Sequence, residues 1–135
     1  MITIKHISKS FDDVQTLKDI SFVFETGKTN LIIGKSGSGK SVLTKCIVGL
    51  HEPDKGEIHF DDRKWSVLKP KARKEIRKEI GMLFQASALF DSLTVEENVA
   101  FPLNMFTKMT KEEISDRVNF CLNRVNIINK NELFP

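Results

Sequence analysis

The chain has 135 residues, of which 40% are hydrophobic and 29% charged, with a formal net charge of +3 at pH 7. This length suffices for one modest domain, and the composition is that of an ordinary globular protein. No apolar run approaches the roughly 18 residues that cross a bilayer, and the N-terminal MITIKHISKSF lacks the apolar block of a secretory signal, so neither class is expected. Cys46 and Cys121 have neither metal-ligand nor redox spacing, which predicts free thiols.

Strand and helix patterns alternate through the first half of the chain. Residues 1–7 alternate apolar and polar side chains and predict a half-exposed strand, and a second strand is expected over 17–27. Residues 31–33 are consecutive and apolar, as in a strand covered on both faces of a parallel sheet. Helical spacing of apolar residues predicts a helix over 41–50, ended by Gly49 and Pro53.

The second half begins with a turn and ends in helices. PDKG, residues 53–56, is a turn signal, and an alternating strand follows over 57–62. A short basic helix is expected from Pro70, then an apolar strand over 80–84. Two further helices open on capping-box pairs, Thr94 with Glu97 and Thr110 with Glu113. The fold class is therefore α/β with a helical appendage.

The segment GKSGSGKS, residues 34–41, carries the strongest chemical signal. Gly34, Gly39, Lys40 and Ser41 match G-x-x-x-x-G-K-[ST], the phosphate-binding P-loop. Its glycines let backbone N–H groups turn toward an anion, and the helix that follows adds the positive end of its dipole. Lys40 suits the β- and γ-phosphates and the Ser41 hydroxyl suits Mg²⁺. The alternative, a glycine-rich loop without a ligand, is disfavoured because a buried strand and a helix flank the motif.

A P-loop indicates a nucleotide but not the reaction. NKNE, residues 129–132, resembles a guanine-binding motif only superficially, since it follows a helix and no Gly has an Asp three residues before it. A small-molecule or nucleotide kinase is the more serious rival, and would need lid arginines and an acidic residue at a strand end.

The residues around the P-loop resemble the nucleotide-binding subunits of ATP-binding cassette (ABC) transporters, from about Ile2 to the end of the chain. The resemblance rests on KSF, LKDISF, GKSGSGKSVLTKCIVGLHEPDKGEIHF, IGMLFQ and LTVEENV in this order, and is more specific than the P-loop alone. It implies an ATPase that uses ATP and Mg²⁺. It also implies a P-loop NTPase core with an antiparallel β subdomain and the start of a helical subdomain.

The same resemblance implies roles for individual residues. Phe11 falls where the family keeps an aromatic residue that stacks on adenine, and the alternative is a core residue. Gln85 falls at the Q-loop, where its side chain would reach Mg²⁺ and the attacking water; the alternative is an ordinary polar residue at a strand end. Lys40 and Gln85 are thus the expected catalytic residues, and Ser41 and Gln85 the expected metal contacts. The expected nucleotide-binding residues are Phe11, Gly34, Lys35, Ser36, Gly37, Ser38, Gly39, Lys40, Ser41 and Val42.

A finer resemblance covers residues 82–103, MLFQASALFDSLTVEENVAFPL, which look like the ATPases of Mla-type, Mce-associated phospholipid transporters. It implies phospholipid transport by a cytoplasmic subunit, peripheral on the inner face of the cell membrane. The permease would be contacted through the Q-loop and a groove of the helical subdomain. The family also implies a homodimer with ATP between the two copies.

The segment from Arg63 to Lys78 contains eight Lys or Arg and one acidic residue, Glu75. A run of this kind can meet nucleic acid or anionic lipid. Because Trp65 is its only aromatic residue, a solvated helix face is favoured and no nucleic-acid partner is expected.

The chain departs from the family in what it lacks. We find no LSGGQ-like signature, Walker B strand or switch histidine, and Asp62 follows the P-loop too closely to replace the Walker B acid. We therefore expect an N-terminal fragment, with the nucleotide-binding core over 1–84 and the Q-loop and beginning of the helical subdomain over 85–135. The expected function is to couple ATP binding and hydrolysis to transport. The alternatives are a nucleotide-binding module that hydrolyses nothing and a soluble ABC ATPase acting on nucleic acid.

Overall fold

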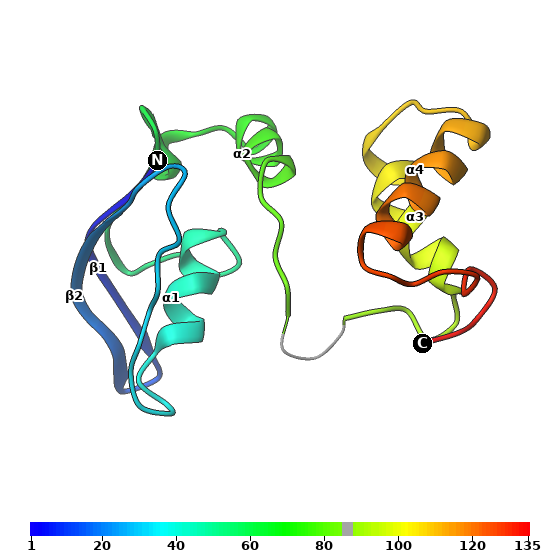
Figure 1. Ribbon diagram of the computed structural model, residues 1–135. Helices are drawn as coiled ribbons and strands as arrows, with labels where there is room; N and C mark the ends of the chain where they lie inside the picture. Colours follow the sequence, from blue (N-terminus) through cyan, green and yellow to red (C-terminus); the bar gives the residue numbers. More distant parts are fainter. Residues whose placement is uncertain (85–87) are drawn as a thin grey trace. The chain divides into compact units, whose positions relative to one another are not determined.

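The computed structural model describes residues 1–84 and 88–135, which fall into two compact units, Met1–Met82 and Leu83–Pro135 (Figure 1). Each unit has its own hydrophobic core and is described by itself. Within the described ranges, none of the helices combines the length and apolar character that crossing a membrane requires.

The first unit is built on a four-stranded antiparallel sheet in the order β2-β1-β3-β4. The long hairpin of β1 (Ile2–Phe11) and β2 (Val14–Phe24) turns at residues 12–13, and β3 (Lys55–Phe60) and β4 (Arg63–Lys64) extend the sheet on the other side of β1. The strands predicted over 1–7 and 57–62 are confirmed. The second strand begins three residues earlier than expected, because the hairpin pairing extends to its turn.

A bulge in β1 keeps two isoleucines on the same face of the sheet. Ile4 and Ile7 are both fully buried, although residues three apart in a regular strand point to opposite faces. The register shifts between them, and His6 adopts a left-handed φ of 54°, as expected for a bulge. On β3, Gly56 has a φ of 96°, and a Cβ there would lie 2.4 Å from the His6 carbonyl oxygen. The last residue of the predicted PDKG turn is thus needed for a close approach of two strands.

Helices α1 (Lys40–Ile47) and α2 (Pro70–Lys78) complete the first unit, and α1 covers one face of the sheet (Figure 1). Both helices were predicted, and Pro70 is the first helical residue of α2 as expected. A short 3-10 turn, Trp65–Val67, precedes α2 and places the Trp65 ring in the core. The buried residues of this core are Ile4, Ile7, Leu17, Leu43, Cys46, Ile47, Ile58, Phe60, Trp65 and Ile76.

Two predicted strands are not formed. Residues 31–33 and 80–84 have no strand pairing, and Leu31, Ile33 and Leu83 are 82%, 81% and 95% exposed. The physical reason is that a strand requires a neighbour to complete its hydrogen bonds. Among the described residues no strand lies beside either segment. The prediction of strands at these two apolar runs is therefore wrong.

The second unit contains α3 (Val95–Phe106) and α4 (Lys111–Arg124), packed through Ala100, Val118 and Leu122. Both predicted capping boxes are confirmed. The side chain of Thr94 accepts from the Glu97 N–H while the Glu97 carboxylate accepts from the Thr94 N–H, and Thr110 and Glu113 do the same.

Candidate functional site

The loop 34–39 joins the hairpin to α1 and has the backbone shape that the P-loop motif predicts. Gly37 and Gly39 have φ values of 75° and 90°. Gly39 also lies tightly against β2, because a Cβ there would lie 2.9 Å from Leu17 Cδ2 and 3.0 Å from the Thr16 carbonyl oxygen. Glycine is thus required at Gly39 both by its conformation and by its packing.

The N-terminus of α1 is left open for an anion. Its N-cap is Gly39, so no side chain caps the helix, and its first turn has no acidic residue. In contrast, α3 and α4 each have a complete capping box and two acidic residues in the first turn. The first N–H groups of a helix need acceptors, and a phosphate group is one that this N-terminus would suit.

Lys40 reaches back over the loop. Its Nζ donates hydrogen bonds to the carbonyl oxygens of Gly34 and Lys35, both at 2.8 Å. The same ammonium group could instead bind phosphate oxygens over the loop, which is the use that the motif implies. Ser41 is exposed at the start of α1, so its hydroxyl is accessible to a metal ion bound with a phosphate.

A cavity of about 200 Å³ lies between the loop and the hairpin. Ser38, Gly39 and Lys40 line one part of it, and apolar side chains line the rest: Leu17, Ile20, Ile32, Ile33 and Leu43. Sequence reasoning did not connect Leu17 or Ile20 with this site. No local motif could have done so, because these residues join the loop only through the packing of Gly39 against β2.

Phe11 ends β1, is 39% exposed, and is not part of the buried core. Its ring packs against that of His51 in a T-shaped arrangement, with 5.3 Å between ring centroids, and Lys9 Nζ lies over the Phe11 ring, 5.5 Å from its centroid. A partly exposed aromatic ring can offer its accessible surface to a planar ligand. His51 was not singled out from the sequence, since it is 40 positions away from Phe11 along the chain.

The carboxylate of Asp54 fixes the segment that follows His51 to the end of β1. It accepts from Lys9 Nζ and from the Ser10 N–H, both at 2.7 Å. The hydrogen bond from Lys9, and then that from Ser10, hold the Asp54 pKa below its ordinary value. The Asp54 carboxylate is therefore ionised at neutral pH while it bonds Lys9 and Ser10.

All the predicted site residues except Gln85 lie among the described residues. Gly34 to Val42 form one continuous loop and helix start, and Phe11 lies at the turn of the hairpin whose strand β2 contacts Gly39. Gln85 lies outside the described residues.

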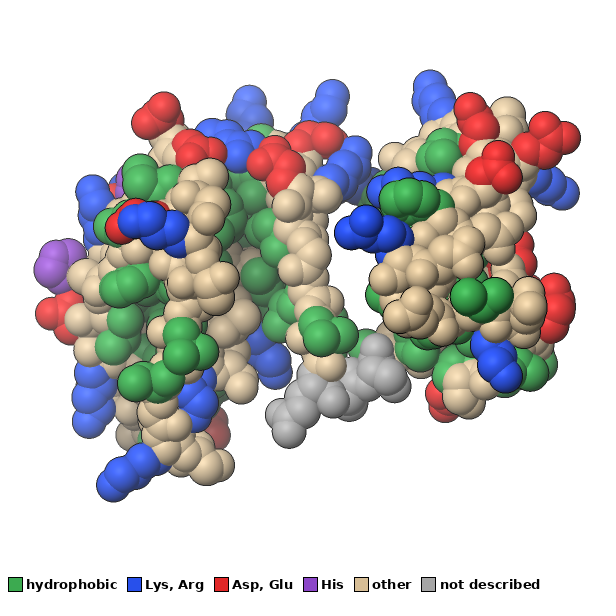
Figure 2. Space-filling model, viewed as in Figure 1, with side chains coloured by type: hydrophobic (Ala, Val, Ile, Leu, Met, Phe, Trp, Pro, Cys, Tyr) green, Lys and Arg blue, Asp and Glu red, His purple; other side chains and the backbone are tan. Residues whose placement is uncertain are grey.

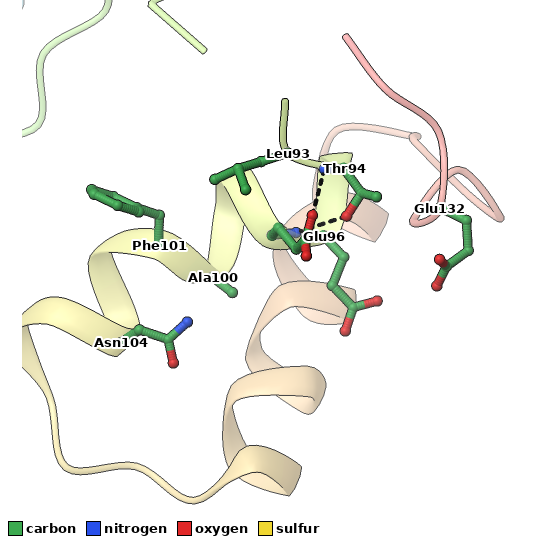
Figure 3. A pocket seen from close by; sticks show the side chains of 8 residues that line it. Leu93, Thr94, Glu96, Ala100, Phe101, Asn104 and Glu132 are labelled. Carbon is green, nitrogen blue, oxygen red and sulfur yellow. Dashed lines mark hydrogen bonds between the residues drawn. The ribbon is translucent and has the colours of Figure 1, made fainter. Parts of the chain in front are cut away.

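The second unit has a hollow of about 470 Å³ on α3 (Figure 3). Leu93, Ala100 and Phe101 give it an apolar wall, and the Phe101 ring lies 4.8 Å from that of Phe90. The other lining residues are polar: Thr94, Glu96, Glu97, Asn104 and Glu132. The hollow is thus half apolar and rimmed by carboxylates.

Comparison with known proteins identifies the wider family. A sequence model described as "ABC transporter" matches residues 17–134. The chain is 42% identical over 130 residues to the methionine import ATP-binding protein MetN of Clostridioides difficile (strain 630), covering 96% of this chain and 40% of that protein. It is 39% identical over 142 residues to MetN of Protochlamydia amoebophila (strain UWE25), covering 100% of this chain and 41% of the relative. The chain therefore spans well under half the length of these curated relatives.

Solved structures give the same result. The ATP-binding cassette MJ0796, in a dimeric post-hydrolysis state bound to ADP and Pi, matches with a TM-score of 0.90 and 30% identity, over 100% of this chain and 62% of that chain. A second dimeric structure of MJ0796, described as a bacterial ABC transporter cassette, matches with a TM-score of 0.89 and 30% identity, over 99% of this chain and 61% of that chain. The α/β cassette fold expected from the sequence is confirmed. The finer expectation of an Mla-type phospholipid transporter is not supported, because the relatives named here import methionine.

Proposed function

Because this chain belongs to the ABC transporter family, we propose that it is the ATP-binding part of a transporter subunit that couples ATP binding and hydrolysis to transport. The observation that carries the proposal is the open N-terminus of α1, with Lys40 folded over a glycine loop. This arrangement presents uncapped N–H groups and one ammonium group to an anion.

Each residue of the site has a part in this proposal. The loop from Gly34 to Ser41 binds the phosphates, with the Lys40 ammonium on the β- and γ-phosphate oxygens. The Ser41 hydroxyl holds Mg²⁺, which would neutralise charge on the phosphates. Phe11 stacks on the adenine, supported by its contact with His51. Gln85 would contact the metal ion and orient the attacking water.

The two halves of the chain have separate roles in the proposal. Residues 1–84 form the nucleotide-binding core, and residues 85–135 the Q-loop and the beginning of the helical subdomain. The permease subunit contacts this second segment, for which the hollow on α3 offers an apolar wall. Two copies enclose the nucleotides at the cytoplasmic face of the cell membrane, and the similar MJ0796 cassette is dimeric and bound to ADP and Pi.

The relatives favour methionine as the transported substrate, at 42% and 39% identity over nearly the whole chain. The resemblance of residues 82–103 to phospholipid-transporter ATPases is the rival argument. Uptake of labelled methionine by cells with and without the gene distinguishes methionine from phospholipid as the transported substrate. Normal methionine uptake together with an altered phospholipid distribution between membranes would favour the rival.

Nucleotide binding tests the site itself. We expect Lys40→Gln to weaken binding of a fluorescent ATP analogue by about 10- to 100-fold, since hydrogen bonds to a charged group contribute roughly 1.5–3 kcal/mol. Lys45→Gln is the matched control, because it removes the same charge from the last turn of the same helix. Equal affinities for the two variants would refute the proposed phosphate contact. Phosphate release by the same chain distinguishes an ATPase from a module that only binds.

A further inference from the structure

A row of lysines on α2 has no part in the proposed nucleotide site. Lys71, Lys74 and Lys78 follow helical spacing and so share one side of the helix, while Lys69 is its N-cap residue. All four are exposed, whereas Ile76 is buried in the core. We call these four residues, three on one side of α2 and one at its N-terminal end, the lysine face. Figure 2 shows blue side chains projecting from the top of the first unit, where Figure 1 places α2.

The arginines of the same segment, in contrast, are held within the first unit. Arg73 and Arg77 both lie over the buried Trp65 ring, with 5.0 and 5.3 Å between guanidinium carbon and ring centroid. Arg63 donates two hydrogen bonds to the Glu79 carboxylate, at 2.8 and 2.9 Å. These arginines therefore contribute to the fold, and the exposed positive charge of the segment comes from four lysines and Arg77.

The lysines at the start of α2 do not stabilise the helix. Lys69 and Lys71 stand at the positive end of the helix dipole, where the first turn contains no acidic residue. Lys74 and Lys78 are like charges four residues apart, an unfavourable arrangement on a helix. Among the described residues, Lys69 and Lys71 have no carboxylate partner, while Lys78 pairs with Glu75. For Lys69 and Lys71, the natural complement is a negative surface outside the described residues.

The chemistry of the face favours a membrane over a nucleic acid. Lysine is a flexible point charge that suits a diffuse negative surface, whereas nucleic-acid recognition relies on arginine forks and exposed aromatic rings. Trp65 is 2% exposed and cannot stack on a base, while Val67, two residues before Lys69, is 72% exposed and can enter a headgroup layer. We propose that the lysine face binds the anionic headgroup surface of a membrane.

Vesicle co-sedimentation of the 135-residue chain tests this proposal, with vesicles of phosphatidylcholine alone or with one-third phosphatidylglycerol. We expect binding only to the anionic vesicles, weakened by salt. The triple variant Lys69→Gln, Lys71→Gln, Lys74→Gln should lose on the order of 100-fold in partitioning, since each lysine near such a surface contributes about fivefold. Circular dichroism checks that the variant remains folded.

A charge-matched variant is the control. Lys108→Gln, Lys111→Gln and Lys130→Gln remove three exposed charges from the second unit, so the net charge falls by the same amount. This variant should keep most of the affinity. If both variants lose the same affinity for anionic vesicles, binding depends only on net charge and the proposal is overturned. Equal binding to both kinds of vesicle, no binding to either, or tighter binding to an RNA oligonucleotide than to anionic vesicles would also overturn it. Neither variant alters the P-loop, so these outcomes are independent of nucleotide binding.

Discussion

Replacing Gly49 by alanine should destabilise the first unit more than any ordinary loss of glycine. Gly49 follows α1 with a φ of 73°, and an added Cβ would lie 2.1 Å from Trp65 Cζ2 and 2.7 Å from Cη2. The Trp65 ring cannot move aside easily, because it is 2% exposed and packs against Phe60 with 5.8 Å between ring centroids.

The magnitude has two parts. A non-glycine residue in the left-handed region costs about 1–2 kcal/mol, and overpacking a well-filled core costs about 1–3 kcal/mol. We therefore expect Gly49→Ala to lower the free energy of unfolding by about 2–5 kcal/mol. Gly27→Ala measures the conformational cost alone, since Gly27 has the same φ of 73° and nothing lies within 4 Å of an added Cβ. Gly27→Ala should lower the free energy of unfolding by only about 1–2 kcal/mol.

Urea unfolding followed by circular dichroism and by the fluorescence of the single tryptophan measures both variants. In a Trp65→Leu background the ring is absent, so the added cost of Gly49→Ala should fall to that of Gly27→Ala. If Gly49→Ala costs no more than Gly27→Ala in the wild-type background, the predicted close packing of Trp65 on Gly49 is refuted.

Three further predictions concern other parts of the chain. The Glu57 carboxylate accepts hydrogen bonds from Lys64 and His59, which lower its pKa from 4.5 to about 2. The ionised carboxylate therefore stabilises the fold above about pH 4.5, and this stabilisation is lost as the pH falls toward 2. In Glu57→Gln, the free energy of unfolding should depend less on pH within that window. Thr110→Ala should destabilise α4 by about 1 kcal/mol in urea unfolding, while Thr110→Ser retains the capping oxygen and should change little. Burial raises the pKa of the Cys46 thiol, so iodoacetamide should alkylate Cys46 in the native chain much more slowly than the half-buried thiol of Cys121, and comparable rates would contradict the core position of Cys46.

Local patterns in the sequence were enough to predict the features that depend on neighbouring residues. The P-loop motif predicted a phosphate-binding shape, and the structure shows left-handed glycines and an uncapped helix at that place. Capping boxes fixed the starts of α3 and α4, because each box satisfies N–H groups within four consecutive residues. The family followed from the order of such motifs along the chain, and the comparisons confirm it. The transported substrate did not follow, because the segment that suggested phospholipid belongs to a subunit whose relatives named here import methionine.

Tertiary structure decided what depends on contacts between distant residues. It placed His51 against the Phe11 ring and Leu17 against Gly39, pairings that no local pattern contains. It also placed arginines of the basic segment against Trp65 and Glu79, whereas the lysines of α2 are exposed. Residues 31–33 also show this dependence on distant contacts, because the strand predicted there does not form. Their apolar run predicts a buried strand, but a strand forms only where a neighbour completes its hydrogen bonds, and composition cannot supply that neighbour.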